Sequence, residues 1–301
     1  ETVLTSKYWH QVAPGSFGLP DVLKRIGYRI TFLLGGDHTR FYGLRAAYGD
    51  AVDEYQDGST SEGYLNDDFK VLEGLRNYRP QEGVPQFLFM HLMSAHPLGL
   101  RHAEYRRWSP SEVGVRSLST EQLVPAYVNN YHNGILQADA VIERIFGLLR
   151  DKGLLKDAIV VVTADHGELL GEEGRIGHAR PVPLEGLVRV PLLIYDSEGF
   201  RYPARMPASQ VDVAPTLLDR IGAAVPRNWA GVQLTKPAQR AGVCLQTGTV
   251  RGIVAADHGR LWKYLVDARG GGERVVDVTA SGRDEPDQRG TLDAETLSRL
   301  R

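Results

Sequence analysis

The sequence predicts an α/β protein with a doubly wound, mostly parallel sheet flanked by helices, followed by a small antiparallel subdomain. Helix and strand patterns alternate along most of the chain, which is typical of a parallel sheet. The run Ile159–Val162 is continuous and β-branched, as expected of a central strand buried on both faces. Near residue 240 the pattern changes to short strands separated by glycine-rich turns. We therefore expect a large α/β domain over residues 1–240 and a small sheet with a helix over 241–301.

Hydrophobic periodicity and end signals predict the elements in order. A helix opens at Pro20 and ends at Gly27, and a buried strand follows over 28–34. Apolar residues at steps of three and four predict a long helix that ends before Gly153. The remaining elements are predicted as strands over 87–93, 159–162 and 190–195, a helix over 212–221, short strands over 243–247, 250–256, 261–266 and 275–278, and a last helix from about Asp293.

Composition excludes several classes of protein. The 301 residues are 42% hydrophobic and 24% charged, which is ordinary for a globular chain. The net charge is -2 and the Lys and Arg residues are scattered, so we expect no nucleic-acid partner. The single cysteine, Cys244, rules out an intrachain disulfide framework and a cysteine metal cluster. No stretch approaches the roughly 20 apolar residues of a membrane span.

Three predicted strands end in turns that carry a histidine. His38 follows the first strand, His96 follows the second, and His166 follows the run Ile159–Val162. A single histidine at a strand end is more often a hydrogen-bonded structural residue than a functional one. The carboxyl ends of parallel strands share one edge of the sheet, where ligands of open α/β folds bind. Three histidines at this edge therefore indicate a functional site.

The strongest signal is the segment Thr163–Glu168, which contains Asp165 and His166 side by side. A carboxylate and an imidazole that leave a buried strand together can both reach one divalent cation. Mixed oxygen and nitrogen ligands favour zinc or manganese, whereas calcium prefers oxygen ligands. The alternative interpretation is an aspartate that caps the next turn beside a surface histidine.

The motifs around this turn resemble those of the sulfatases and the related phosphoethanolamine transferases, a branch of the alkaline phosphatase superfamily. Asp165–Gly174 resembles their "DHGE.LGE.G" pattern, and Gly177–His178 and Val188–Ile194 resemble the "GK" or His step and the "RVPL.I" strand that follow it. Further similarities occur in the family's order over nearly the whole chain, at Asn133, Asp139, Val211–Leu218, Pro226, Gly231, Lys263–Leu265 and Val276–Val278.

The resemblance implies roles for three further histidines. His38 lies within a residue of the histidine in the sulfatase "GKWH" turn, and His96 resembles the histidine of the "pH.P" turn. With His178, they are expected to face the transferred group and the leaving group, on the same side of Asp165 and His166. Imidazolium groups can stabilise developing negative charge and protonate a departing alkoxide. Arg40, Arg45 and Arg101 are weaker candidates for anion binding, with a surface role as the alternative.

The resemblance also implies parts that these 301 residues do not contain. Leu4–Lys7 resembles the "LTG" element that follows the nucleophile of sulfatases, so the nucleophile and a further acidic ligand are expected upstream of Glu1. We therefore expect residues 1–240 to be a catalytic domain that lacks its N-terminal part, folded but inactive alone. The hydroxyls of Thr2, Thr5 and Ser6 are expected to be structural.

Three functions remain open. The first is a metal-dependent phosphotransferase or phosphohydrolase that acts on cell-envelope lipids or glycans through a covalent intermediate. His178 favours it, because many sulfatases have Lys at this position and phosphoethanolamine transferases have His. The second is a sulfatase that uses calcium, and the third is a degenerate lipid-binding module. The resemblance further implies a periplasmic or extracytoplasmic location and an N-terminal membrane anchor outside these residues.

Overall fold

The computed structural model divides the chain into two compact units, which are described separately. The first unit comprises Glu1–Ile159 with Asp196–Gly199, and the second comprises Val160–Tyr195 with Phe200–Arg301. The structure describes residues 2–8, 11–13, 16–40, 44–60, 66–113, 120–178, 183–203, 207–236, 240, 242–270, 272–279, 287–288, 290, 292 and 294–300. The expected boundary between residues 240 and 241 stays a prediction.

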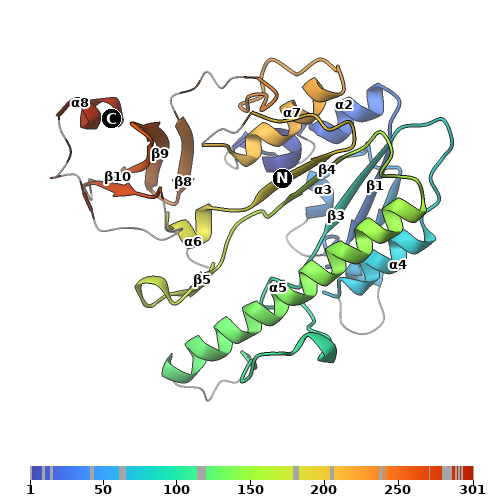
Figure 1. The fold of residues 1–301 in the computed structure, drawn as a ribbon, viewed down its shortest axis with the longest axis horizontal. Coiled ribbons are helices and arrows are strands. Elements are labelled where there is room, and N and C mark those ends of the chain that lie inside the picture. The colour runs from blue at the N-terminus through green and yellow to red at the C-terminus, as the bar shows by residue number, and fades with distance from the viewer. Residues whose placement is uncertain are drawn as a thin grey trace. The chain divides into compact units, whose positions relative to one another are not determined.

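The first unit is built around the parallel sheet β2-β1-β3 (Figure 1). Strand β1 (Arg29–Leu34) lies in the middle and is almost completely buried, as its apolar sequence predicts. Its register with β3 (Gln86–His91) pairs Arg29 with Gln86 and Leu34 with His91, so the two strands end at the same edge. The other elements of this unit are α1 (Thr2–Thr5), α2 (Leu19–Arg25), α3 (Leu44–Ala47), β2 (Glu54–Gln56), η2 (Gly58–Thr60), α4 (Phe69–Asn77), η3 (Ala103–Tyr105) and α5 (Thr120–Asp151).

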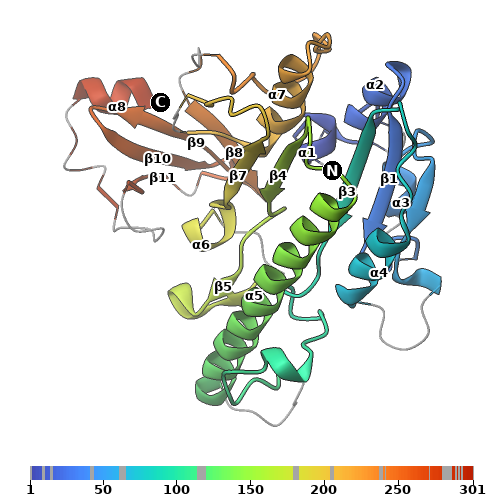
Figure 2. The same cartoon turned by 45° about the vertical axis from the view of Figure 1, so that its right-hand side comes forward.

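Helices α4 and α5 cover one face of this sheet (Figure 2). Leu33 of β1 packs in one cluster with Leu72 of α4 and with Val141 and Ile145 of α5. Each of these side chains is less than a tenth exposed, and burial of one such side chain stabilises the fold by about 1.5–3 kcal/mol. The three- and four-residue spacing of the long helix therefore corresponds to its core-facing side.

Strand β3 ends two residues earlier than the apolar pattern predicts. Its last residue is His91, whereas the predicted strand continued to Met93. The carboxylate of Asp68, at the start of α4, accepts hydrogen bonds from the backbone N–H groups of Met93 (2.6 Å) and Ser94 (2.9 Å). These amides bind a side chain in place of a neighbouring strand, so the chain leaves the sheet there.

The second unit contains β4 (Ile159–Thr163, in which Ile159 belongs to the first unit) and its partner β7 (Leu192–Asp196, in which Asp196 does). Between them lies a hairpin of β5 (Leu169–Leu170) and β6 (Ile176–Gly177), which encloses η4 (Glu172–Gly174) and is followed by α6 (Glu185–Val188). The unit also contains η5 (Gln210–Asp212) and α7 (Val213–Arg220).

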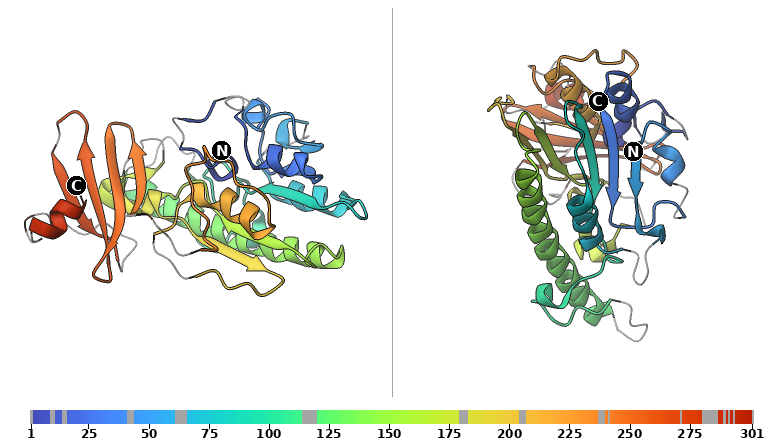
Figure 3. Two further views of the ribbon diagram at one scale, coloured as in Figure 1. Left: turned by 90° about the horizontal axis from the view of Figure 1, so that it is seen from above. Right: turned by 90° about the vertical axis from the view of Figure 1, so that its right-hand side faces the viewer.

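The antiparallel subdomain also belongs to the second unit (Figure 3). Its strands β8 (Gly242–Thr247), β9 (Val250–Asp257), β10 (Arg260–Asp267) and β11 (Glu273–Asp277) pair in the order β11-β10-β9-β8. Helix α8 (Ala294–Leu300) packs Leu300 into the cluster that contains Trp262 and Tyr264. The predicted fold class, a parallel sheet with helices and a small antiparallel subdomain, is confirmed. Within the described residues, no helix is long and apolar enough to cross a membrane.

Asp57, directly after β2, holds the backbone that follows β1. Its carboxylate accepts hydrogen bonds from the N–H groups of His38 (3.0 Å), Thr39 (2.8 Å) and Ser59 (2.9 Å) and from the Tyr55 hydroxyl (2.8 Å). Burial raises the pKa of this carboxyl, but the hydrogen bonds from Ser59, Thr39 and Tyr55 together outweigh burial and lower the pKa to about 2. The turn that carries His38 therefore depends on an ionised Asp57.

We expect Asp57→Asn to lower the free energy of unfolding by about 2 kcal/mol at neutral pH, because an amide cannot accept this set of hydrogen bonds. The folded pKa lies below the ordinary value of about 4, so the contribution of the carboxylate is present above pH 4 and is lost as the pH falls towards 2. Urea unfolding at pH 7 and pH 3 should show a smaller difference between variant and wild type at pH 3. Exposed Asp50→Asn is the control, and an equal difference at both pH values would contradict this assignment.

Candidate functional site

A short hairpin brings Glu168 and His178 together in the second unit. Strands β5 and β6 pair Leu169 with Gly177, so the next position outward sets Glu168 opposite His178. Glu168 Oε2 accepts a hydrogen bond from His178 Nδ1 at 2.8 Å, and the Glu168 side chain is only 5% exposed. This hydrogen bond raises the pKa of His178 above its usual range, against the opposing effect of burial. The proton on Nδ1 leaves Nε2 as the ring nitrogen turned away from Glu168.

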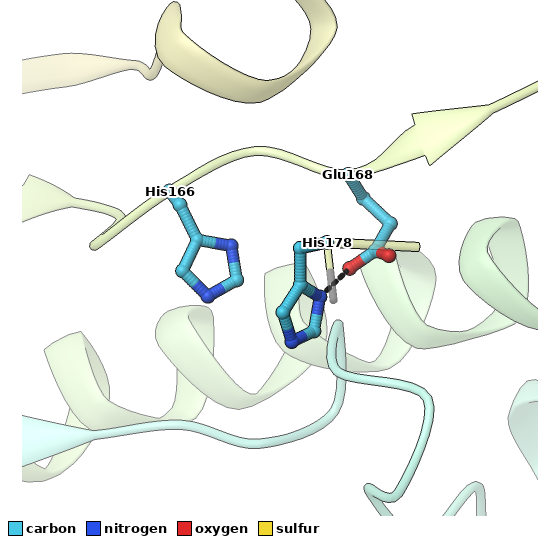
Figure 4. A group of neighbouring side chains, drawn as sticks. All are labelled: His166, Glu168 and His178. Atoms are coloured by element: carbon cyan, nitrogen blue, oxygen red, sulfur yellow. Dashed lines mark hydrogen bonds and ion pairs between the residues drawn. The ribbon is translucent and has the colours of Figure 1, made fainter. Parts of the chain in front are cut away.

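His166 lies beside His178 in a matching orientation (Figure 4). Its Nδ1 is 2.8 Å from the carbonyl oxygen of Gly167. A carbonyl only accepts, so Nδ1 carries the proton and a neutral ring keeps its lone pair on Nε2. The two ring centroids are 4.3 Å apart, and the far nitrogens of both rings point the same way (Figure 4). His166 Nε2 is also 3.5 Å from Oδ2 of Asp165.

The backbone of this turn is held on two sides. The Gly167 N–H donates to the carbonyl of Leu187 in α6 at 2.8 Å. A Cβ atom on residue 167 would lie 2.1 Å from the carbonyl oxygen of Gly186, so only glycine fits there. On the other side, the Gln210 amide donates to the carbonyls of Ala164 and Asp165. The direction in which Asp165 and His166 leave β4 is therefore set by their neighbours.

The donor chemistry of this cluster fits a divalent metal ion. His166, Glu168 and His178 each offer one ligand atom, and these atoms lie within 4.8 Å of one another. Imidazole nitrogens with carboxylate oxygens suit zinc or manganese. Because Glu168 is buried and already accepts from His178, it fits the carboxylate that commonly orients a functional histidine. Binding of the ion by Asp165 and His166, expected from the sequence, stays a prediction.

The first unit places His38 and His96 in different surroundings. His38 is buried after β1, where its Nε2 is 3.2 Å from Nδ1 of His91 and its Nδ1 is 2.7 Å from the Tyr48 hydroxyl. His96 lies in the turn after β3, and its Nδ1 accepts from the N–H of Leu98 at 3.1 Å. The structure therefore groups His38 with His91 and Tyr48.

The predicted site residues thus fall into two sets. Asp165, His166 and His178 lie together in the second unit, whereas His38 and His96 belong to the first. Convergence of the two sets around one transferred group stays a prediction. Arg101, expected to be a surface residue or an anion ligand, is instead buried and donates to backbone carbonyls, including that of His96 at 2.7 Å.

Two contributors escaped the sequence analysis. Glu168 stands in the quoted motif, but only the hairpin register shows that it meets His178. The sequence signal for this hairpin was the six-residue spacing between Leu170 and Ile176, which pair with each other. The polar segment between these two residues made the hairpin hard to recognise. Gln210 carried no signal, because it is 45 residues away from Asp165 in sequence.

Comparison with known proteins identifies the family. The family model described as "Sulfatase" matches residues 2–223. The chain is 30% identical over 165 residues to an extracellular sulfatase SULF-1 homolog of Drosophila melanogaster, covering 50% of this chain and 14% of that protein. It is 31% identical over 106 residues to a multifunctional alkaline phosphatase superfamily protein, PehA, of Trinickia caryophylli, covering 33% of this chain and 20% of that protein. The chain thus spans less than a quarter of either relative.

Solved structures share the fold at low sequence identity. One is a protein in complex with its substrate D-glucosamine-2-N,6-O-disulfate, with a TM-score of 0.71, 16% identity and coverage of 99% of this chain and 84% of that chain. Another is the C-terminal periplasmic domain of EcEptC from Escherichia coli in complex with Zn, with a TM-score of 0.62, 15% identity and coverage of 79% and 71%. The chain belongs to the sulfatase family, within the alkaline phosphatase superfamily of hydrolases and transferases of sulfate and phosphate esters.

Proposed function

We propose that this chain provides the metal-binding part of an active site that transfers or hydrolyses phosphate esters of cell-envelope lipids or glycans through a covalent enzyme intermediate. The observation that carries the proposal is the pair of adjacent imidazoles, His166 and His178, with Glu168 behind one and Asp165 beside the other. Such a pair offers one ring to a metal ion and the other to the oxygens of a bound anion.

Each residue has a distinct role in this proposal. Asp165 and His166 hold the metal ion, zinc or manganese, which when bound supplies positive charge for an ester oxygen. His178 donates from Nε2 to the transferred group or to the leaving oxygen, and Glu168 favours its protonated form. His38 and His96 are proposed to face the same group. A zinc-bound structural neighbour, the periplasmic domain of EcEptC, supports zinc and a periplasmic setting.

Sulfate esters are the second candidate substrate. The matching family model and several curated relatives, among them an arylsulfatase K of Gallus gallus at 35% identity over 106 residues, are described as sulfatases. Calcium would then be the expected ion. The third candidate, a lipid-binding module without turnover, would keep the fold without using the histidines.

The proposed nucleophile is a hydroxyl or modified cysteine outside the set Thr2, Thr5 and Ser6. Thr5 is 4% exposed and Ser6 is fully buried, so neither hydroxyl is placed to attack an ester. The first unit also uses these residues in the packing of its N-terminal helix, where Leu4 is buried too. Their structural role, expected from the sequence, is retained in the proposal.

We expect Asp165→Asn and His166→Ala to remove the bound divalent ion, about one per chain in the wild type. Elemental analysis after dialysis against a weak chelator measures this. The matched controls are Asp257→Asn and His258→Ala, because Asp257 and the exposed His258 form another Asp-His pair at the turn between β9 and β10. Glu168→Gln should keep the ion. Loss of the ion in Glu168→Gln but not in Asp165→Asn would make Glu168 the metal ligand and contradict that role for Asp165.

The pH dependence of turnover should report the Glu168–His178 hydrogen bond. The pKa of His178 is raised, so the protonated ring persists to higher pH and activity that needs it falls as the pH rises through this pKa. In the protein that contains this chain, Glu168→Gln should shift the alkaline limb of kcat to lower pH, and His178→Ala should lower kcat by about 10²-fold with little change in metal content. If the alkaline limb of kcat does not shift in Glu168→Gln, His178 is not the proton donor.

Turnover of matched esters distinguishes the candidate functions. The protein that contains this chain should cleave p-nitrophenyl phosphate with a kcat/KM at least 10-fold above that for p-nitrophenyl sulfate, because His178 offers a protonated donor to a more highly charged group. A preference for the sulfate would establish the second candidate. Metal binding without turnover of either ester would favour the lipid-binding module.

A further inference from the structure

We propose that Lys263, in the C-terminal antiparallel sheet, is a positioning residue for the Asp165–His166 turn and acts through helix α6. The proposal rests on the proposed function only in taking the group that this turn binds to be a divalent metal ion. The link itself consists of contacts within the second unit.

The first step of the link is a fully buried cation. Lys263, in the middle of β10, is 0% exposed, which is rare for a lysine. Its Nζ donates to the carbonyl oxygen of Pro183 at 2.6 Å and lies 3.1 Å from Oε1 of Glu185. Glu185, the first residue of α6, is 4% exposed. The sheet therefore binds the beginning of α6 through both a backbone carbonyl and a side-chain carboxylate.

The second step joins α6 to the Asp165–His166 turn. Gly167 donates its N–H to the Leu187 carbonyl at 2.8 Å, and its Cα lies against the carbonyl of Gly186. Leu184 and Leu187 also pack with Leu169 just beyond the turn. Because the helix is a single turn and the contact at Gly167 has no spare room, a shift of α6 must displace residue 167.

A second contact joins the other end of α6 to the C-terminal subdomain. Arg189, which follows α6, donates to the carbonyl of Val278 at 3.0 Å, and its guanidinium is 3.9 Å from Glu185. Glu185 therefore lies between two cations, one buried and one partly exposed. The short helix is held at both ends by residues of the C-terminal subdomain.

The energetics favour a positioning role over a stabilising one. A buried ion pair adds little net stability compared with apolar side chains of the same volume, because desolvation offsets the attraction. The pair instead fixes the position of α6, because the ammonium group contacts the carbonyl of Pro183 and the carboxylate of Glu185 at the same time. Lys263 lies beyond residue 223, outside the segment matched by the family model. The subdomain would thus be part of the site's support.

Hydrogen exchange and metal binding test the proposal independently. In Lys263→Met, the peptide that contains Gly167 should exchange its amide hydrogens at least about 10-fold faster than in the wild type, and binding of Zn²⁺ or Mn²⁺ by calorimetry should weaken by about 10-fold, the usual scale for residues that support a metal ligand. Val275→Ala is the matched control, because Val275 is fully buried in the adjacent strand β11 but packs in the core under α8. It should lower the melting temperature without changing either readout.

The outcomes separate this inference from the proposed function. Equal exchange around Gly167 in Lys263→Met and Val275→Ala, at equal loss of melting temperature, would overturn the inference. If Lys263→Met does not fold, Glu185→Gln carries the decision with the same two readouts, since it removes the charge and leaves an acceptor for Lys263. A wild type that binds neither ion would refute the metal site, while faster exchange at Gly167 would still support the link from Lys263.

Discussion

The close contact between Gly167 and helix α6 is the constraint on which the candidate site depends. The chain leaves the half-buried strand β4 at Thr163 and must present Asp165 and His166 before it enters the β5–β6 hairpin. The contact with Gly186 fixes where it turns, and it does so with backbone atoms, which cannot adjust as a side chain can. The orientation of His166 and the start of the hairpin both follow from that turn.

Buried carboxylates organise both units, but with different consequences for the groups around them. Asp57 accepts mostly backbone and hydroxyl donors, so it stays ionised and acts as a fixed anchor for the His38 turn. Glu168 accepts a hydrogen bond from an imidazole, and this interaction raises the pKa of His178. One carboxylate therefore stabilises a loop, and the other changes the chemistry of its neighbour.

The chain contains the dipeptide Asp-His three times, at Asp37–His38, Asp165–His166 and Asp257–His258. Local sequence makes them look alike, yet their surroundings differ. His38 is buried beneath Tyr48 and His91, whereas His258 has a left-handed backbone at a hairpin turn and is largely exposed. His38 and His166 each have a second imidazole beside them, but His178, next to His166, is hydrogen-bonded to the buried Glu168 carboxylate. The function of such a pair is therefore a property of its neighbours.

The sequence alone determined the α/β class, the longer strands, the long helix and the segment Thr163–Glu168, because periodicity and end signals act over a few residues, whereas the short strands β2, β5 and β6 were missed. It also determined the family, because the motifs occur in order along the chain. Tertiary structure decided that Glu168 orients His178, that Gln210 and α6 hold the turn, and that β3 stops at His91 where Asp68 binds the next amides. It also decided that Lys263, the one lysine within the otherwise apolar run 261–266, is fully buried. These contacts join residues 10 to 80 positions apart, and no local pattern encodes which distant donor will meet which acceptor.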